Sequence, residues 1–286
     1  MLKQQQVPVA TTFFSLLERR WQRGNFVCVG LDPEYERLPA IVKEGRSKTE
    51  ALGMFLRAII DATHDQVCAY KPNSAFYEAL GDAGITVLAE IIAYCKTAYP
   101  EIPIILDAKR ADIGNTNLGY VAAAFDLMRV DAITVHPYLG KEALAPFLER
   151  ADKGIIVLAK TSNPGSGELQ DLLVGEAQEP LYLVVARNVA RHWNTHNNCA
   201  LVVGATYPED LKRIREAVGD LPLLIPGIGI QGGDVEATVK AGKDSHSQGM
   251  MINSSRSIIY ASTGPDFAQA ARKATEALAA EINTYR

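Results

Sequence analysis

Two acidic and two basic side chains lie within six residues of one another, directly after an apolar run. The stretch IILDAKRADIGNT at residues 104–116 contains Asp107, Lys109, Arg110 and Asp112. Residues i and i+2 of a strand point to the same side, so Asp107 and Lys109 are predicted to project together as an ion pair. A lysine held there could stabilise developing negative charge and deliver a proton, because its compact ammonium can approach a reacting atom.

The spacing leaves open whether Asp112 turns back toward Asp107 and Lys109. The alternative interpretation is a solvated cluster of charges that merely follows a strand. The uninterrupted apolar run before the cluster and the glycine-containing turn after it favour a functional site.

Short apolar runs rich in β-branched residues recur eight times and would have to position these side chains. They cover residues 26–32, 66–71, 102–109, 131–136, 154–160, 199–205, 221–227 and 249–255. Strands that are apolar on both faces are typical of buried parallel sheets. The pattern predicts an α/β fold, a closed (β/α)8 TIM barrel, rather than an open doubly wound sheet, because the turn GLDPEYERLP lacks G-x-G-x-x-G.

The segments between these runs carry apolar residues at helical spacing. Helices are predicted over 51–63, 84–98, 115–128, 141–150 and 208–218, with an additional one at 11–23 in an N-terminal extension (1–24) and a closing one at about 266–284 in a C-terminal segment (266–286). Nothing resembles a linker, so one barrel domain over 1–286 is expected. The long connection 161–180 is interpreted as an active-site loop, followed by a helix at 181–193.

Composition and charge narrow the classes of protein and of binding partner that fit this chain. The chain has 286 residues, 48% of them hydrophobic and 22% charged, as ordinary globular proteins have. Proteins that bind nucleic acid or an anionic membrane usually carry an excess of basic residues. The formal net charge of -4 shows no such excess and favours a small polar substrate. No signal-peptide or membrane-spanning pattern is found, so a cytoplasmic location is expected. The four cysteines form no CxxC pair, which predicts buried reduced thiols and no metal site.

In a barrel, reactive residues lie at the carboxyl ends of strands and in the loops just beyond them. The predicted strand ends carry Asp32, Lys71, Asp107 with Lys109, His136, Lys160 with Ser162, the loop PGIGIQGGD (226–234), and NSSRS (253–257). The glycine-rich loop and Arg256 together predict a phosphate site. The alternative is that the glycines occur there only because a tight turn requires positive φ. No role follows for His136 or Arg110, and Lys160 either faces the site or anchors its loop.

Together these motifs resemble the orotidine 5'-phosphate decarboxylase family. LDAKRADIGNT is similar to that family's D-x-K-x-x-D signature, and GLDP, YKPN, KTSNPG, PGIGIQGG and SSRSI are similar to further motifs in the same order. The long loop after the fifth strand and the overall length resemble the longer bacterial subgroup.

The resemblance implies a barrel that converts orotidine 5'-phosphate to uridine 5'-phosphate (UMP) in de novo pyrimidine biosynthesis without a metal or organic cofactor. It implies that Lys109 donates a proton to C6, that Asp107 lies beside the substrate carboxylate, and that Lys71 completes an alternating charge network. Asp112 and Thr116 match positions lent to the neighbouring subunit, which implies a homodimer with shared active sites.

The resemblance also implies a set of substrate-binding residues. They are Asp32 for the ribose hydroxyls, Ser162 for the pyrimidine ring, Gln231 and Arg256 as phosphate ligands, and Ser255.

Two rival interpretations stay open. One is a magnesium-dependent sugar-phosphate decarboxylase or aldolase of the same barrel superfamily, in which a glutamate metal ligand would be expected where this chain has Lys71. The other is a catalytically silent barrel that only binds a phosphometabolite. A pure binder does not need an opposed charge array, so this interpretation is disfavoured by the full set of Asp32, Lys71, Asp107, Lys109 and Asp112.

Overall fold

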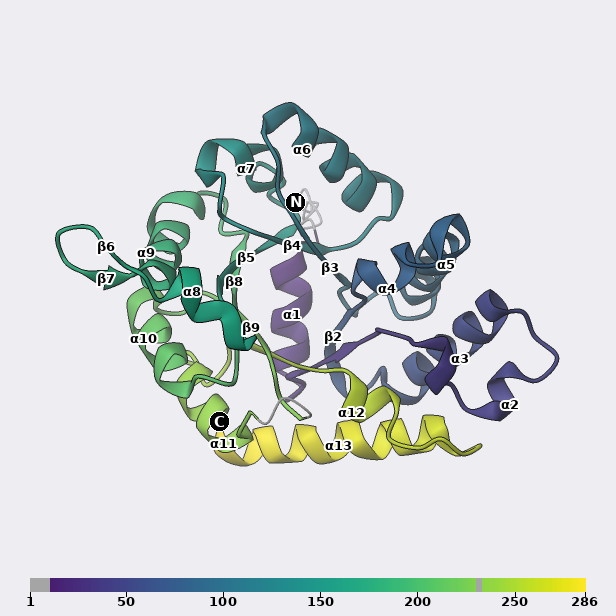
Figure 1. Ribbon diagram of the computed structural model, residues 1–286. Coiled ribbons are helices and arrows are strands. Elements are labelled where there is room, and N and C mark those ends of the chain that lie inside the picture. The colour runs from purple at the N-terminus through teal and green to yellow at the C-terminus, as the bar shows by residue number, and fades with distance from the viewer. Residues whose placement is uncertain (1–10, 230–232) are drawn as a thin grey trace, which may run out of the picture.

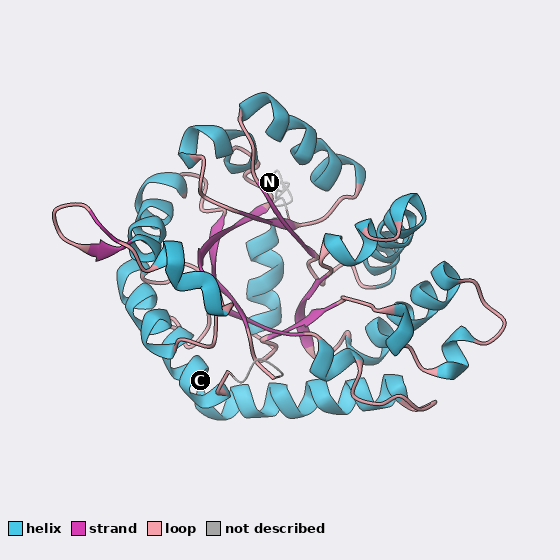
Figure 2. Cartoon of the chain, viewed as in Figure 1, coloured by secondary structure: helices cyan, strands magenta, loops and turns pink. Residues whose placement is uncertain are grey.

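Eight short apolar strands pair in parallel and close into a barrel surrounded by helices, as Figure 1 and Figure 2 show. The computed structural model describes residues 11–229 and 233–286. The strands are β1 (Val27–Gly30), β2 (Val67–Lys71), β3 (Ile105–Arg110), β4 (Ala132–Val135), β5 (Gly154–Lys160), β8 (Cys199–Val203), β9 (Leu223–Pro226) and β10 (Met250–Ser254). Each coincides with one of the eight predicted runs, which confirms the predicted (β/α)8 barrel.

The barrel closes where β2 meets β3. The hydrogen-bonded order of the strands is β2-β1-β10-β9-β8-β5-β4-β3, so β2 and β3 stand at its two ends. The Tyr70 N–H donates to the Pro103 carbonyl at 3.1 Å, and the Asp107 N–H donates to the Pro72 carbonyl at 2.9 Å. These bonds bring the ends of β2 and β3 together and thereby place Lys71 next to Asp107.

Helices cover the outer face of the barrel. The longer ones are α1 (Phe13–Trp21), α3 (Lys48–Thr63), α5 (Gly81–Ala98), α6 (Gly114–Val121), α7 (Gly140–Leu148), α9 (Leu181–Asn188), α10 (Pro208–Val218), α11 (Val235–Gly242) and α13 (Phe267–Tyr285). The short ones are α2 (Ala40–Lys43), α4 (Ser74–Glu78), α8 (Gly167–Gln170) and α12 (Arg256–Ile259), with 3-10 turns at Tyr35–Arg37 and Pro164–Ser166. None of these described helices is both long and apolar enough to cross a membrane.

The predicted helix boundaries are right to within a turn or so, with identifiable exceptions. The helix predicted from residue 51 begins at Lys48, because Ser47 and Glu50 form a reciprocal capping box. The helices predicted over 115–128 and 181–193 each continue from an α-helix into a π-helical turn, at Ala122–Leu127 and Val189–Trp193. The apolar periodicity does not distinguish these two kinds of turn.

Helix α1 lies across the amino ends of the strands, opposite the predicted site. The Arg20 guanidinium donates to the Val67 carbonyl at 2.7 Å, and the Trp21 indole donates to the Met250 carbonyl at 2.8 Å. A Cβ at Gly154 would lie 2.2 Å from the Phe13 ring, so glycine there lets the helix pack closely on β5. The predicted N-terminal helix is therefore part of the barrel's core.

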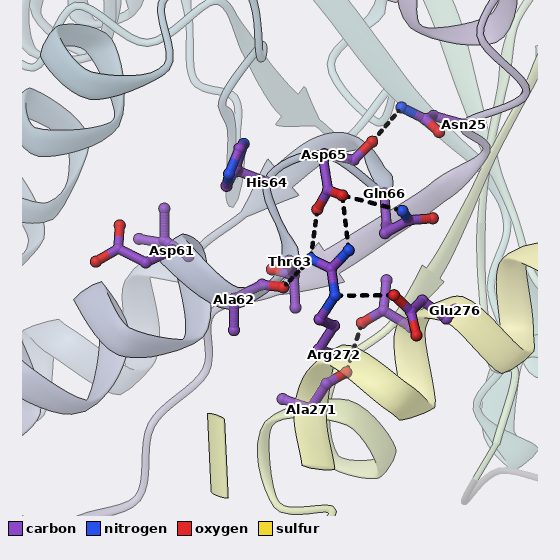
Figure 3. A network of polar contacts seen from close by, with 12 residues as sticks. Asn25, Asp61, Ala62, Thr63, His64, Asp65, Gln66, Ala271, Arg272 and Glu276 are labelled. Atoms are coloured by element: carbon purple, nitrogen blue, oxygen red, sulfur yellow. Dashed lines mark hydrogen bonds and ion pairs between the residues drawn. The ribbon is translucent and has the colours of Figure 1, made fainter. Parts of the chain in front are cut away.

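A polar network ties α13 to the loop between α3 and β2, as Figure 3 shows. The Arg272 guanidinium donates to both carboxylate oxygens of Asp65 at 2.8 Å, and also to the Ala62 carbonyl at 2.9 Å. This ion pair lowers the pKa of Asp65 to about 2, with the Arg272 hydrogen bond as the largest cause. The closing helix is thus fixed at the amino end of β2.

The segment 161–180 is more ordered than a plain loop. It contains the 3-10 turn Pro164–Ser166, helix α8, and a small hairpin of β6 (Leu173–Val174) and β7 (Glu179–Pro180). Strands of two residues and a helix of four leave too little periodicity in the sequence to be recognised. The segment joins β5 to α9 at the carboxyl side of the barrel, where an active-site loop was expected.

Candidate active site

The carboxylate of Asp107 accepts a different lysine on each of its oxygens. The Lys71 Nζ lies 2.9 Å from Oδ2, and the Lys109 Nζ lies 2.6 Å from Oδ1. Lys71 is 4% exposed and Asp107 is 8% exposed, whereas the Lys109 side chain is 47% exposed. The predicted pairing of Asp107 and Lys109 is confirmed, and only Lys109 has its ammonium open to an incoming ligand.

The electrostatics of this array keep its buried members charged. Burial alone would lower the pKa of Lys71, but the charges of Asp107 and Asp32 outweigh it and raise that pKa above its ordinary value. Burial alone would raise the pKa of Asp107, but the charges of Lys71 and Lys109 outweigh it and hold that pKa well below its ordinary value. Lys71 and Asp107 are therefore a preformed ion pair at neutral pH.

The strand that carries Asp107 and Lys109 is irregular, which regular alternation did not predict. The pairing of β3 with β4 shifts register between Leu106 and Arg110, and Lys109 has a left-handed φ of 46°. That conformation is energetically unfavourable for a non-glycine residue, which keeps it only where surrounding contacts enforce it. Here the Lys109 N–H donates to the Thr134 hydroxyl at 3.0 Å.

Thr134 on β4 is a site residue that the sequence interpretation missed. Its buried hydroxyl donates to Asp107 Oδ1 at 2.9 Å while it accepts the Lys109 N–H. The signal that could have found it is a hydroxyl residue near the end of a buried strand that neighbours β3. Its role depends on the register between the two strands, which one sequence does not reveal.

Asn73, within the YKPN motif, was also missed and connects two predicted site residues. Its N–H donates to Asp32 Oδ1 at 3.0 Å, and its side-chain amide lies 3.5 Å from Asp107 Oδ2. The Ser255 hydroxyl donates to the other oxygen of Asp32 at 2.8 Å. Asp32, Asp107 and Ser255 thus belong to one polar network at the carboxyl ends of the strands.

A cavity of about 340 Å³ opens beside this network at the predicted phosphate end. It is lined by Asp32, Phe76, Pro226, Gly227, Ile228, Asn253, Ser255, Arg256 and Ser257. The loop that begins with Gly227 and Gly229 has positive φ values of 109° and 91° at these residues, which favour glycine. The prediction for Gln231 falls outside the described residues. The structure therefore brings Asp32, Ser255 and Arg256 to one cavity.

Ser162 lies just beyond the carboxyl end of β5, at the start of the long loop. A Cβ at Gly204 would stand 2.9 Å from the Cα of Ser162, so a glycine at the end of β8 allows close approach of the two backbones. The Thr206 hydroxyl donates to the Ser162 carbonyl at 3.4 Å. These contacts fix the start of the loop against the neighbouring strand.

Within residues 11–229 and 233–286 of one chain, neither Asp112 nor Thr116 forms a hydrogen bond or ion pair with Lys71, Asp107 or Lys109. The Asp112 carboxylate accepts the Ile113 N–H at 2.7 Å, which starts the turn into α6. Thr116 is exposed, and the neighbouring apolar side chains of Ile113 and Leu118 are each 59% exposed. This segment faces outward from its own barrel.

Two other cations at the carboxyl ends of strands, Arg110 on β3 and Lys160 on β5, are bound by structural partners. Arg110 forms an ion pair with Glu78 of α4 and stacks on the Tyr120 ring. Lys160 forms an ion pair with Asp171 of the long loop. Of the two interpretations of Lys160, the structure supports the loop anchor.

The donor set argues against a divalent cation at Asp107. Ammonium groups already occupy both of its oxygens. In residues 11–229 and 233–286, no group of three or more His, Cys, Asp or Glu side chains is arranged to hold a metal ion. The magnesium-dependent alternative needs carboxylate oxygens in the position that Lys71 fills.

Comparison with known proteins gives one family. Residues 25–274 match the family described as Orotidine 5'-phosphate decarboxylase / HUMPS family. The chain is 51% identical over 276 residues to the orotidine 5'-phosphate decarboxylase of Cellvibrio japonicus, covering 96% of this chain and 99% of that one.

Solved structures agree with this match. Leishmania donovani OMP decarboxylase superposes with a TM-score of 0.81 at 37% identity, covering 96% of this chain and 99% of that chain. Leishmania donovani UMP synthase superposes with a TM-score of 0.84 at 40% identity over 96% of this chain, which spans 56% of that longer chain.

Proposed function

This chain belongs to the orotidine 5'-phosphate decarboxylase / HUMPS family, and from that premise we propose that it converts orotidine 5'-phosphate to uridine 5'-phosphate and carbon dioxide at the carboxyl ends of its strands. The observation that carries the proposal is the buried array in which Asp107 is held between Lys71 and Lys109. The magnesium-dependent branch of the superfamily is not supported, because a cation takes the place of its metal ligand.

The array suits a reaction that creates a carbanion. The bond from C6 to the carboxylate breaks, its electron pair stays on C6, and carbon dioxide leaves. Lys109 gives its proton to C6 and regains one from solvent. Preformed charges stabilise such a transition state without reorganising during the step. The low pKa of Asp107 keeps a negative charge beside the substrate carboxylate, and that repulsion is relieved as carbon dioxide departs.

The cavity supports a placement of the rest of the substrate. The phosphate binds at Arg256 and the glycine-rich turn, because a guanidinium and backbone N–H groups both suit phosphate oxygens. The ribose hydroxyls donate to Asp32, which Asn73 and Ser255 orient. Ser162 contacts the pyrimidine, and Gln231 stays a predicted phosphate ligand. Binding energy from the phosphate is then available to position the remote reacting carbon.

We further propose a homodimer in which Asp112 and Thr116 complete the site of the neighbouring subunit. Their outward-facing segment and the exposed Ile113 and Leu118 support such an interface. One barrel domain over 1–286 and a cytoplasmic location stay predictions from the sequence.

The deciding experiment mixes EDTA-treated protein with orotidine 5'-phosphate and follows the pyrimidine absorbance. Turnover that is unchanged by the chelator and unaffected by added magnesium is expected. Lys109→Ala protein from the same preparation serves as the control for contaminating activity. Absence of turnover by the wild-type protein would overturn the proposal, and strict dependence on magnesium would favour the rival branch.

A further inference from the structure

Lys160, the last residue of β5, is a buried cation that the proposed decarboxylation does not use. Its side chain is 1% exposed, and its ammonium pairs with the carboxylate of Asp171. Asp210 Oδ2 of α10 lies 3.9 Å away. The centroids of the Tyr207 and Tyr182 rings lie 4.9 Å and 5.4 Å from Nζ. We call these five residues the Lys160 cluster.

The two acids of the cluster differ in how firmly they are held. Asp210 lies on a regular helix and accepts the Tyr182 hydroxyl at 2.8 Å. Asp171 follows the four-residue helix α8, and its side chain is 50% exposed. The near partner of the buried ammonium is thus a half-exposed acid on the loop, while the acid on the regular helix lies farther away.

A second pair of contacts closes the same short loop. The Thr161 N–H donates to the Gln170 side-chain oxygen at 2.9 Å, and the Gln170 amide donates to the Thr161 hydroxyl at 2.8 Å. Two adjacent residues at the end of β5 therefore bind two adjacent residues at the end of α8. Between them, Ser166 is buried although it belongs to a surface loop.

We propose that Lys160 is a positioning residue, which holds the segment 161–171 in place through Asp171 and so fixes Ser162 for the substrate. If the segment swings away, the buried ammonium keeps only the more distant Asp210 at 3.9 Å, and loss of the near partner of a buried charge is unfavourable. The cluster therefore biases the loop toward its ordered position before any ligand arrives. Preordering of this kind reduces the free energy that ligand binding must supply to order the loop.

The positioning of Ser162 for the substrate rests on the proposed function. The anchoring of the segment 161–171 by Lys160 does not, because it needs no substrate. Two measurements separate the two claims. Cleavage by a glutamate-specific protease without ligand reports the anchor, and turnover of orotidine 5'-phosphate reports its effect on the reaction. Glu168 in α8 is the diagnostic cleavage site, and the exposed Glu176 between β6 and β7 is an internal reference.

The variants are Asp171→Asn, Lys160→Met and the double variant. Lys240→Met, which removes a surface ion pair with Glu236 on α11, is the matched control. We expect Asp171→Asn to speed cleavage after Glu168 about tenfold relative to cleavage after Glu176 and to lower kcat/KM about tenfold, because contacting residues couple on that scale. The double variant should be no worse than Asp171→Asn, and saturating UMP should restore protection at Glu168.

Wild-type cleavage at Glu168 in Asp171→Asn and Lys160→Met would overturn the anchor. Faster cleavage with an unchanged kcat/KM would overturn the positioning role. Equal losses in Lys240→Met would show a general effect of charge removal and would also contradict the proposal. If the wild-type protein has no turnover, the proposed function fails, and the cleavage comparison alone decides on the anchor.

Discussion

The hydroxyl of Thr134 supports Asp107 from the neighbouring strand, donating to its Oδ1 at 2.9 Å. The same oxygen of Asp107 binds the Lys109 ammonium, and the same hydroxyl accepts the Lys109 N–H. One uncharged side chain therefore orients both the acid and the proton donor of the proposed reaction.

Replacing Thr134 should slow the reaction without abolishing binding. Thr134→Val keeps the shape but leaves the Lys109 N–H and Asp107 Oδ1 each without this partner, a loss of about 1 to 3 kcal/mol. We expect kcat to fall by about tenfold or more, since about 1.4 kcal/mol corresponds to a factor of ten. Thr134→Ser, which keeps the hydroxyl, is the control in steady-state kinetics. Equal rates for Ser and Val would contradict this role.

Removing the exposed ammonium should separate chemistry from binding. Lys109→Ala is expected to abolish turnover while UMP still binds in calorimetry, because the cavity that contains Arg256 is left intact. Arg110→Ala is the matched control, since this adjacent cation pairs with Glu78 on α4. The control should retain turnover, and retained activity in Lys109→Ala would remove its role as proton donor.

Lys71 and Asp107, the buried members of the array, should contribute more to the stability of the protein than the partly exposed Lys109. Asp107→Asn leaves the Lys71 ammonium buried without its hydrogen-bonded counter-charge, so we expect the free energy of unfolding in urea to fall by about 3 to 5 kcal/mol. Lys71→Met should cost less, because Asp107 then still pairs with the partly exposed Lys109. The reverse order of the two variants would show that the array is not held as described.

The shared site can be tested by mixing two inactive proteins. Lys109→Ala and Asp112→Ala homodimers should each be inactive, but exchange of subunits would produce heterodimers with one intact site. Partial recovery of decarboxylation is the expected result. Lys109→Ala mixed with Lys109→Ala/Asp112→Ala is the control, which has no intact site. No recovery after exchange has been demonstrated by mass spectrometry would contradict donation across the interface.

The ion pair of Asp65 and Arg272 predicts a defined dependence of stability on pH. The pKa of Asp65 falls from 3.8 to about 2 in the folded protein, so its stabilisation is complete above pH 4 and is lost as the pH falls through 2. Both side chains are about 40% exposed, which limits the contribution to about 1 kcal/mol or less. The deficit of Asp65→Asn in urea unfolding should shrink over this interval. A deficit that does not change with pH would contradict the assignment.

The barrel could be predicted because its strands are covered on both faces. Each of the eight runs is mostly apolar, and most of them end in a charged or polar residue that could do chemistry. The strands and the position of the site could therefore be predicted together. The same reasoning placed Asp32, Lys71, Asp107 and Arg256 at one end of the barrel, where the structure has them.

What could not be predicted depends on the register between strands and on contacts between distant segments. The left-handed Lys109 and its support from Thr134 arise from a register shift of β3 against β4. The role of Lys160 depends on Asp171 in a loop and Asp210 on a helix beyond β8. No local periodicity encodes either relationship.

The hydrogen bond from Trp21 to the Met250 carbonyl has a consequence for biosynthesis. Helix α1 leaves the ribosome before any strand of the barrel, yet one of its binding partners lies at the start of the last strand, 229 residues later. Until β10 has been synthesised, the apolar face of α1 lacks part of the surface on which it packs. Contacts so distant in sequence slow folding and leave nascent chains prone to aggregation. The helix made first is therefore among the last elements that can complete their docking, and its apolar face stays partly uncovered until the last strand has been synthesised.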